Sequence, residues 1–271
     1  MFVRIHTRYN LIINEEKGGF MAVVEYIKEG RIAHIIVNRP ESMNALNSEV
    51  FQGLWNAFAA FRDDQELWVA ILTGAGDRAF CAGADIIGLV TGFSPEGDDV
   101  PVRPDNIWKP FIAAVNGYCL GGGCELALMC DIRIASENAQ FGQPEVNIGF
   151  MPAMGGTVRI PRFLPRAIAA EMLLTGNRIN AQEALRIGLV SRIVPREKLL
   201  DTAKEIANTI ITRGPLGVRA VKESMVRGYD MTLDEGLELE KALSAKLRNT
   251  EDFIEGAQSF AEKRPPRYKG K

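Results

Sequence analysis

Histidine is scarce in this chain, and its scarcity excludes several catalytic classes. The 271 residues contain only two histidines, His6 and His34. Ser-His-Asp and Cys-His mechanisms need a histidine beside the nucleophile, and the Gly-x-Ser-x-Gly turn of many serine hydrolases is also missing. The sequence therefore argues against nucleophilic hydrolysis. His34 alternates with apolar neighbours in a strand-like segment, so we interpret it as structural.

Paired cysteine motifs are absent as well. The four cysteines, Cys81, Cys119, Cys124 and Cys130, form no Cys-x-x-Cys pair and lie far in sequence from both histidines. A zinc site is therefore not supported, and we expect no metal. Each cysteine lies in an apolar or glycine-rich stretch, which is typical of buried free thiols in a reducing compartment. We accordingly expect a cytoplasmic protein.

Strong net charge and long apolar runs are also lacking. A formal net charge of -2 gives no general attraction for nucleic acid or an anionic membrane, so neither partner is expected. No stretch approaches the ~20 uncharged apolar residues of a membrane-spanning helix. The first twenty residues have no apolar signal-peptide centre, and a cleaner pattern begins at Met21. We interpret residues 1–20 as an extension outside the fold.

The apolar periodicity that is present alternates between strand and helix. A hairpin is predicted from strands at 23–26 and 32–38, followed by a helix capped by Asn47 or Ser48. Apolar runs predict further strands at 68–73, 111–118, 131–135 and 189–194, and the run that contains the second of these continues to residue 120. This alternation predicts an α/β core over residues 21–197 that carries the active site.

The last part of the chain has a helical pattern, which defines a helical C-terminal region at 198–271. Two capping boxes are predicted, Asn180 with Glu183 before this region and Thr232 with Glu235 within it. Apolar stripes on these helices must be buried against the core or against another subunit.

Three successive glycines followed by Cys124 and Glu125 form the most distinctive motif. They lie between an apolar run and the apolar start of a helix. Without side chains, they let another group come close to the bare backbone N–H groups at the positive end of that helix. Gly122 and Glu125 are three residues apart and would be neighbours on one helix face. A backbone donor beside a carboxylate suits a reaction that passes through an oxyanion and a proton transfer. The alternative is a tight turn with an exposed glutamate.

Two other segments could complete such a site. The turn Gly83-Ala84-Asp85 can offer the N–H of Ala84, and with that of Gly122 this would make an oxyanion hole. Glu145 follows Pro144, which fixes the local backbone, and would add a second carboxylate to share a water with Glu125. Spacing alone does not show that the three segments converge.

Taken together, the motifs resemble the crotonase family of enoyl-CoA hydratases and isomerases, over about residues 21–268. The matching segments are 35–46, 79–86, 113–127, 141–145, 155–157, 174–176, 184–190 and 262–264. The resemblance implies a core built as a spiral of ββα turns. It also implies a helical C-terminal region that forms homotrimers, often paired into hexamers.

By the same resemblance, the N–H groups of Ala84 and Gly122 would hold the thioester oxygen of an acyl-CoA substrate. Glu125 and Glu145 match the catalytic glutamates of the hydratases, with Glu125 activating the water and Glu145 delivering a proton. The expected substrate-binding residues are Ala82, Gly83, Ala84, Asp85, Ile86 and Gly121. The resemblance implies no cofactor, since coenzyme A is part of the substrate.

The resemblance thus implies a lyase, an enoyl-CoA hydratase that adds water in syn fashion to a trans-2-enoyl-CoA. The alternatives are an isomerase or cyclic dienoyl-CoA hydratase of the same fold, or a non-catalytic acyl-CoA-binding scaffold. Ile87-Gly88 stands where many hydratases carry a lysine, which leaves Arg39, or Lys263 of a neighbouring subunit, as candidates for contact with CoA. The segment 149–154 has bulky side chains where the family has a more glycine-rich segment. It could reshape the acyl pocket, so the sequence leaves the identity of the acyl group open.

Overall fold

The computed structural model describes residues 22–85 and 103–271. The expected N-terminal extension at 1–20 and the expected binding residue Ile86 lie outside the described residues. The sequence also predicts a helix that starts after Gly83 and a long loop over residues 91–106, and both lie largely outside the described residues.

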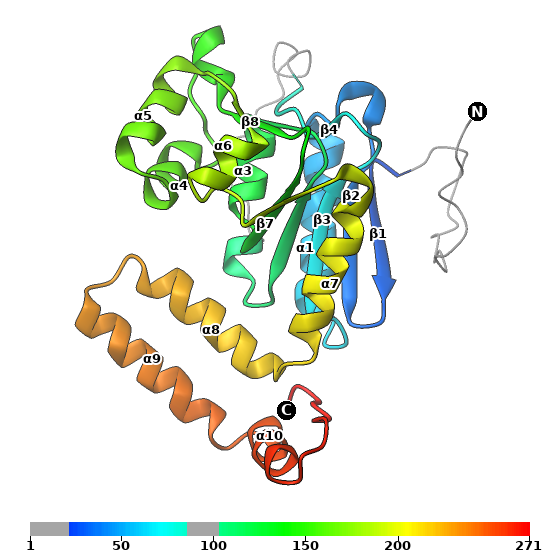
Figure 1. Ribbon diagram of the computed structural model, residues 1–271, viewed down its shortest axis with the longest axis vertical. Helices are drawn as coiled ribbons and strands as arrows, with labels where there is room; N and C mark the ends of the chain where they lie inside the picture. The colour runs from blue at the N-terminus through cyan, green and yellow to red at the C-terminus, as the bar shows by residue number, and fades with distance from the viewer. Residues whose placement is uncertain (1–21, 86–102) are drawn as a thin grey trace.

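Two β-sheets organise the described chain, in the strand orders β1-β2-β3-β5-β7-β10 and β4-β6-β8-β9. The larger sheet contains β1 (Val24–Glu29), β2 (Ile32–Val37), β3 (Val69–Gly74), β5 (Phe111–Val115), β7 (Ile132–Ser136) and β10 (Arg192–Val194). The smaller contains β4 (Ala79–Cys81), β6 (Tyr118–Leu120), β8 (Gln140–Gly142) and β9 (Ile179–Asn180). With helices between and around these strands, the predicted α/β class is confirmed (Figure 1).

The strands follow a repeating order along the chain. β3, β5 and β7 are parallel neighbours in the larger sheet, and each is followed by a strand of the smaller sheet, where β4, β6 and β8 are again parallel neighbours. Two of these strand pairs lead into the helices α3 (Gly122–Leu128) and α4 (Gly156–Phe163). This succession is the ββα spiral, and it stacks the segments that follow β4, β6 and β8 side by side.

The apolar run from residue 111 to residue 120 is not one strand, as the sequence predicts, but two. β5 ends at Val115 in the larger sheet, and β6 begins at Tyr118 in the smaller one. The Asn116 side chain donates to the carbonyls of Gly74 and Gly76, at 2.9 and 3.0 Å. A Cβ on Gly117 would lie 2.2 Å from the carbonyl oxygen of Arg78, so only glycine fits. The chain therefore changes sheet here.

Each face of the larger sheet is covered by a helix. Ile35, Leu72 and Ala113 face a core cluster that includes the apolar side of α1 (Ser48–Asp63), whose N-terminus is capped by Asn47 as predicted. The alternate residues Ile71 and Ile112 pack with Ala203 of α7 (Leu199–Ile211) on the other face. The period-two alternation of the strands thus places α1 and α7 on opposite faces.

Three short helices cover the smaller sheet and the region of its strand ends: α4, α5 (Arg166–Thr175) and α6 (Ala181–Arg186) (Figure 1). The capping box predicted for α6 is half present. Asn180 accepts a hydrogen bond from the N–H of Glu183, but the Glu183 carboxylate accepts hydrogen bonds from Arg186 instead of reaching back. The strand predicted at 189–194 begins only at Arg192.

The last three helices lie beyond the sheets. α8 (Pro215–Gly228) and α9 (Leu233–Leu247) run side by side as a hairpin, and α10 (Glu251–Ala261) lies beside the C-terminal segment (Figure 1). The capping box of Thr232 with Glu235 is confirmed. The buried Lys222 ties α8 to the core, because its ammonium donates to the carbonyls of Pro104 and Lys109 and pairs with Asp131. No helix in the described ranges is both long and apolar enough to cross a membrane.

Candidate active site

The glycine motif forms the turn between β6 and α3. Gly121 has a φ of 53°, in the region that favours glycine, and its N–H donates to the carbonyl of Gly142. A Cβ on Gly123 would lie 2.1 Å from the carbonyl oxygen of Cys81, so the helix packs directly on backbone. Glu125 lies in the first turn of α3 and is only 1% exposed. The alternative of a turn with an exposed glutamate is therefore wrong.

The segment that follows β4 approaches this turn backbone to backbone. Gly83 has a φ of 100°, and a Cβ there would lie 3.0 Å from the Leu120 carbonyl oxygen and 3.5 Å from the Gly122 nitrogen. A Cβ on Gly122 would in turn lie 3.9 Å from the Ala84 nitrogen. The two turns, whose convergence spacing alone does not show, therefore lie together in the fold.

The N–H groups of Ala84 and Gly122 are both left without an acceptor in the described part of the chain. In the parallel bridge to Leu46, the carbonyl of Gly83 and the N–H of Asp85 are used, which turns the N–H of Ala84 to the opposite side. Gly122 is the first residue of α3, so its N–H has no acceptor within the helix. Leu46 and Met154 flank the position, at 3.0 and 3.3 Å from where a Gly122 Cβ would stand.

Backbone donors hold the carboxylate of Glu125 from one side. Its Oε1 accepts hydrogen bonds from the N–H groups of Met154 and Gly156, both at 2.7 Å. Gly156 is the first residue of α4, so the carboxylate lies at the positive end of that helix. With Oε1 occupied in this way, Oε2 remains for a further partner.

Glu145 lies against the glycine turn at Gly121. It belongs to the single turn η3 (Pro144–Ile148), which Pro144 opens as the sequence suggests. Its Oε1 lies 2.8 Å from the position of a Gly121 Cβ, so a larger residue than glycine would displace it. The amide of the fully buried Gln143 is assigned with its nitrogen toward Glu145, because in that orientation it donates to both carboxylate oxygens, at 3.1 and 3.2 Å.

Burial raises the pKa of both glutamates. For Glu145 the pKa rises to about 7, mainly through desolvation and further through the nearby charge of Glu125. The pKa of Glu125 is also raised by burial, but the N–H groups of Gly156 and Met154 and the charge of Arg159 act against the rise. The pair can therefore hold one ionised and one protonated carboxyl near neutral pH.

The segment expected to bind coenzyme A begins at Ala82, whose N–H donates to the carbonyl of Met43. The carboxylate of Asp85 pairs with the guanidinium of Arg39, at 3.2 Å. This ion pair occupies both Arg39 and Asp85, which makes Arg39 a weaker candidate for contact with CoA. Lys263 is exposed near the end of α10, and Ile86 lies outside the described residues.

The four cysteines are free and buried, as expected. Burial raises the pKa of the Cys81 and Cys130 thiols to about 12, so both are neutral at physiological pH. Within residues 22–85 and 103–271, no three or more histidine, cysteine, aspartate or glutamate side chains gather in a way that could hold a metal ion.

Sequence reasoning missed several residues that surround the glutamates. Gln143 lies inside a motif that was singled out only for Glu145, and Met154 and Gly156 act through their backbone N–H groups, which any residue can supply. Arg159 donates to the carbonyl of Met154 and pairs with Asp105. The one signal that the sequence offers for Arg159 is its position four residues after Gly155.

Comparison with known proteins agrees with this geometry. The model of the enoyl-CoA hydratase/isomerase family matches residues 27–271. The chain is 43% identical to the short-chain-enoyl-CoA hydratase of Clostridium acetobutylicum, over 88% of this chain and 94% of that protein. It is also 43% identical to the (E)-benzylidenesuccinyl-CoA hydratase of Thauera aromatica, over 88% of this chain and 96% of that protein.

Solved structures extend the likeness to the fold. A crystal structure of an enoyl-CoA hydratase from Bacillus anthracis superimposes with a TM-score of 0.87 and 38% identity, covering 92% of this chain and all of the other. The two-sheet spiral described above is therefore the fold of those hydratases.

Proposed function

The chain belongs to the enoyl-CoA hydratase/isomerase family, with the crotonase fold, and from that premise we propose that it is a hydro-lyase that adds water to a trans-2-enoyl-CoA thioester. The observation that carries this proposal is the placement of two carboxylates, the buried Glu125 and the partly buried Glu145, beside a turn with two unpaired N–H groups. An isomerase moves one proton between carbons, whereas hydration needs a base for water and an acid for carbon.

The N–H groups of Ala84 and Gly122 are proposed to bind the thioester oxygen. As water adds to C3, negative charge moves onto this oxygen, and two fixed donors stabilise it without having to reorient. Each such donor contributes about 3–4 kcal/mol in comparable sites. The close backbone approach at Gly83 and Gly122 supports this assignment, because it brings the two nitrogens together without side chains between them.

The two glutamates are proposed to divide base and acid work. Glu125, whose ionised form accepts two backbone hydrogen bonds, takes a proton from water as the oxygen attacks C3. Glu145, whose pKa is raised to about 7, gives its proton to C2 of the enolate. Both groups are proposed to act from the same side of the substrate, which gives syn addition of H and OH. No separate cofactor is needed, because coenzyme A is part of the substrate.

The direct test follows the conjugated-thioester absorbance of crotonyl-CoA mixed with the protein. We expect the absorbance to fall as the double bond is hydrated. If neither crotonyl-CoA nor longer, branched or cyclic dienoyl-CoA esters lose absorbance, the proposed hydration is wrong. Conversion of a 3-enoyl to a 2-enoyl thioester without hydration would instead support an isomerase, and tight binding without turnover an acyl-CoA-binding scaffold.

Substitution of each glutamate tests the division of roles. Glu125→Gln and Glu145→Gln should each lower kcat by about 10²–10⁴-fold, the usual contribution of a general acid or base. Binding of the CoA ester should survive, because the backbone donors remain. Glu137→Gln, which neutralises an exposed carboxylate at the end of β7, serves as the matched control. A Glu125 or Glu145 variant with the control's rate would remove that residue from the mechanism.

The acyl group is proposed to be small or substituted near the double bond. The relatives include enzymes named for a short-chain and for a benzylidenesuccinyl substrate. In this chain Met154 lies beside Gly122, so its side chain limits the space near the reacting carbons. Rates across short, branched and aromatic enoyl-CoA esters will rank these substrates.

We also infer that the protein assembles into homotrimers or dimers of trimers through its C-terminal helices. Val221 and Met225 of α8 are 59% and 69% exposed in the single chain, and Phe260 of α10 is 87% exposed. Such apolar side chains are usually covered in an assembly. The buried free thiols support a reducing compartment such as the cytoplasm.

A further inference from the structure

We propose that Arg159 is a positioning residue for the reaction, which fixes the backbone donors of Glu125 by anchoring them to Asp105. The inference rests on the proposed function, because it assigns Arg159 a role in keeping the base Glu125 oriented and ionised. Arg159 itself touches neither the reacting atoms nor the Glu125 carboxylate. It acts through the peptide groups of Met154 to Gly156.

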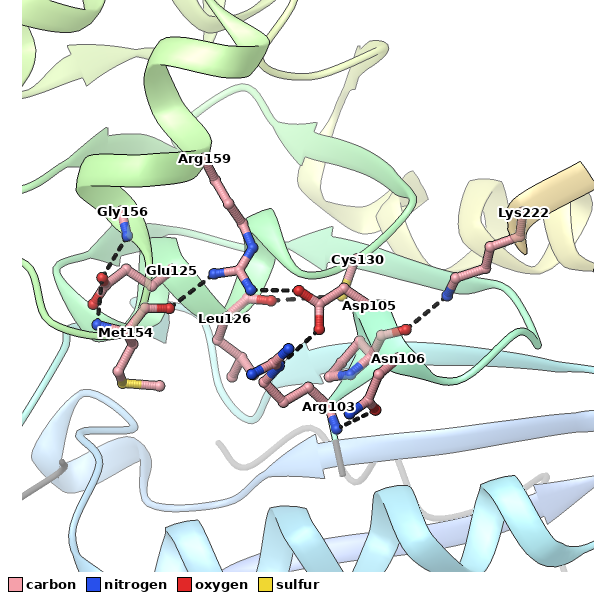
Figure 2. A network of polar contacts seen from close by, with 11 residues as sticks. Arg103, Asp105, Asn106, Glu125, Leu126, Cys130, Met154, Gly156, Arg159 and Lys222 are labelled. Atoms are coloured by element: carbon pink, nitrogen blue, oxygen red, sulfur yellow. Dashed lines mark hydrogen bonds and ion pairs between the residues drawn. The ribbon is translucent and has the colours of Figure 1, made fainter. Parts of the chain in front are cut away.

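The first support is that both backbone polar groups of Met154, its N–H and its carbonyl, form hydrogen bonds. Its N–H donates to Oε1 of Glu125 at 2.7 Å, and its carbonyl accepts from Nη1 of Arg159 at 2.9 Å (Figure 2). The N–H of Gly156, two residues on, donates to the same Oε1. With its N–H held by Glu125 and its carbonyl by Arg159, the Met154 backbone has little freedom to rotate.

The second support is the room made for the guanidinium at Gly155. Arg159 folds back over the start of α4, and a Cβ on Gly155 would lie 1.9 Å from its Nη1. The φ of Gly155 is 103°, a conformation that favours glycine. The glycine pair Gly155-Gly156 thus serves two purposes, since one residue admits the guanidinium and the other donates its N–H to Glu125.

The third support is an anchor that does not belong to α4. Asp105, in the turn η2 (Pro104–Asn106), pairs with Arg159 on one side and with Arg103 on the other (Figure 2). Lys222 of α8 holds the same turn by donating to the Pro104 carbonyl. The charges of Arg159 and Arg103 lower the pKa of Asp105 despite its burial, so the anchor is ionised. Arg159 therefore links Glu125 to a turn fixed from the C-terminal helices.

The charge environment of Glu125 gives Arg159 a second effect. Arg159 of α4 lowers the pKa of Glu125, and the facing carboxyl is Glu145. The thiols of Cys81 on β4 and Cys119 on β6 have pKa values raised by burial, so they stay neutral and add no charge. Arg159 is thus the cation that most directly favours the ionised base.

Three variants test the inference. Arg159→Met removes the charge and the hydrogen bonds, Arg159→Lys keeps the charge but cannot bridge Met154 and Asp105 in the same way, and Asp105→Asn leaves the guanidinium without its counter-charge. Arg162→Met is the matched control, because Arg162 lies on the same helix and pairs with the exposed Asp230 instead. Thermal unfolding shows which variants are folded.

The readouts are kcat, KM and the pH profile of kcat/KM with the enoyl-CoA that the wild type turns over. We expect Arg159→Met to lower kcat by about 10–100-fold with a small change in KM, as misplaced catalytic groups do. Its acid limb should move to higher pH, because Glu125 loses a stabilising cation. In Asp105→Asn the acid limb should move to lower pH, since the charge of Arg159 is no longer compensated.

The outcomes separate this inference from the proposed function. Suppose that the wild type hydrates its substrate. If Arg159→Met and Asp105→Asn then both keep the wild-type kcat and acid limb, or match Arg162→Met, the positioning role is wrong. If the wild type hydrates nothing, the proposed function fails, and hydrogen exchange still tests the positioning. Faster exchange of the Met154 and Gly156 amides in folded Arg159→Met than in Arg162→Met supports the inference, and equal exchange overturns it. Arg159→Lys keeps the comparison available if the methionine variant does not fold.

Discussion

At the scale of single residues, the two glutamates differ in what surrounds each carboxylate. Glu125 is the more deeply buried, yet it accepts two backbone N–H groups and faces a cation, all of which favour its ionised form. Desolvation and the nearby negative charge of Glu125 both disfavour the ionised form of Glu145, and its pKa rises to about 7. The first proton of the pair is therefore lost from Glu125, which suits a base, and the second from Glu145, which suits an acid.

This order predicts the pH dependence of the wild-type enzyme. If Glu145 must be protonated to give its proton to C2, kcat/KM should fall as the pH rises through about 7. Profiles measured between about pH 5 and pH 9 will check this. A rate that stays flat or rises through this range would contradict the assignment of Glu145 as the acid.

The raised pKa of Glu145 also predicts how the stability of the fold depends on pH. The pKa of Glu145 is raised from 4.5 to about 7 in the folded chain, so the folded state binds the proton more tightly than the unfolded state does. The stabilisation is fully present below the unfolded value and is lost as the pH rises to about 7. Glu145→Gln, which cannot ionise, should therefore unfold at a higher temperature than the wild type at pH values above this range.

Sequence reasoning selects the proposed site residues whose side chains form a pattern. Glu125 and Glu145 are carboxylates close to glycines or a proline, and Gly122 is a glycine at a helix start, so each is visible in the sequence. Met154 contributes only its N–H, which every residue but proline carries, so no pattern marks it. Arg159 could not be assigned either, because its partner Asp105 is 54 residues away and comes close only through the fold.

At the scale of elements, most local signals predict the structure correctly, although the α6 capping box is only half present, whereas contacts distant in sequence are not predicted. The caps of α1 and α9 were predicted because Asn47 and Thr232 satisfy N–H groups only three residues away. The break between β5 and β6 was missed, since it depends on the turn that follows β3. The acceptors of the Asn116 side chain, Gly74 and Gly76, lie 42 and 40 residues before it.

Asn116→Ala tests whether these hydrogen bonds hold the change of sheet. The variant leaves the buried carbonyl of Gly74 without its donor, which should lower the free energy of unfolding by about 1–3 kcal/mol. Activity should also fall, since β6 carries the glycine turn. Urea unfolding followed by circular dichroism gives the stability, with Asn177→Ala, an exposed asparagine, as control. Equal midpoints for the two variants would mean that the sheet packing alone sets the break.

At the scale of the whole molecule, the helical end of the chain is only partly covered. Leu243 of α9 is buried within the single chain, and Lys222 fixes α8 to the core. Val221 and Met225 are four residues apart on α8, so they share one of its faces, and both are exposed in the single chain. Periodicity gives the apolar face of a helix, but it does not say whether the core or another subunit covers it.

The exposed face of α8 therefore leads to a prediction about assembly. Wild-type protein should sediment at about three or six times the 29.9 kDa of one chain, because burying this face removes apolar area from water. Met225→Glu places a carboxylate where Met225 is 69% exposed in the single chain, so it should shift the mass toward that of a monomer. Gln52→Glu, which adds the same charge to the exposed side of α1, should leave the mass unchanged. A monomeric wild type, or a Met225→Glu assembly as stable as that of Gln52→Glu, would show that α8 does not carry the subunit contact. Because a carboxylate buried without a partner costs far more than one left in water, the contrast between the two variants reports burial in the assembly, not charge alone.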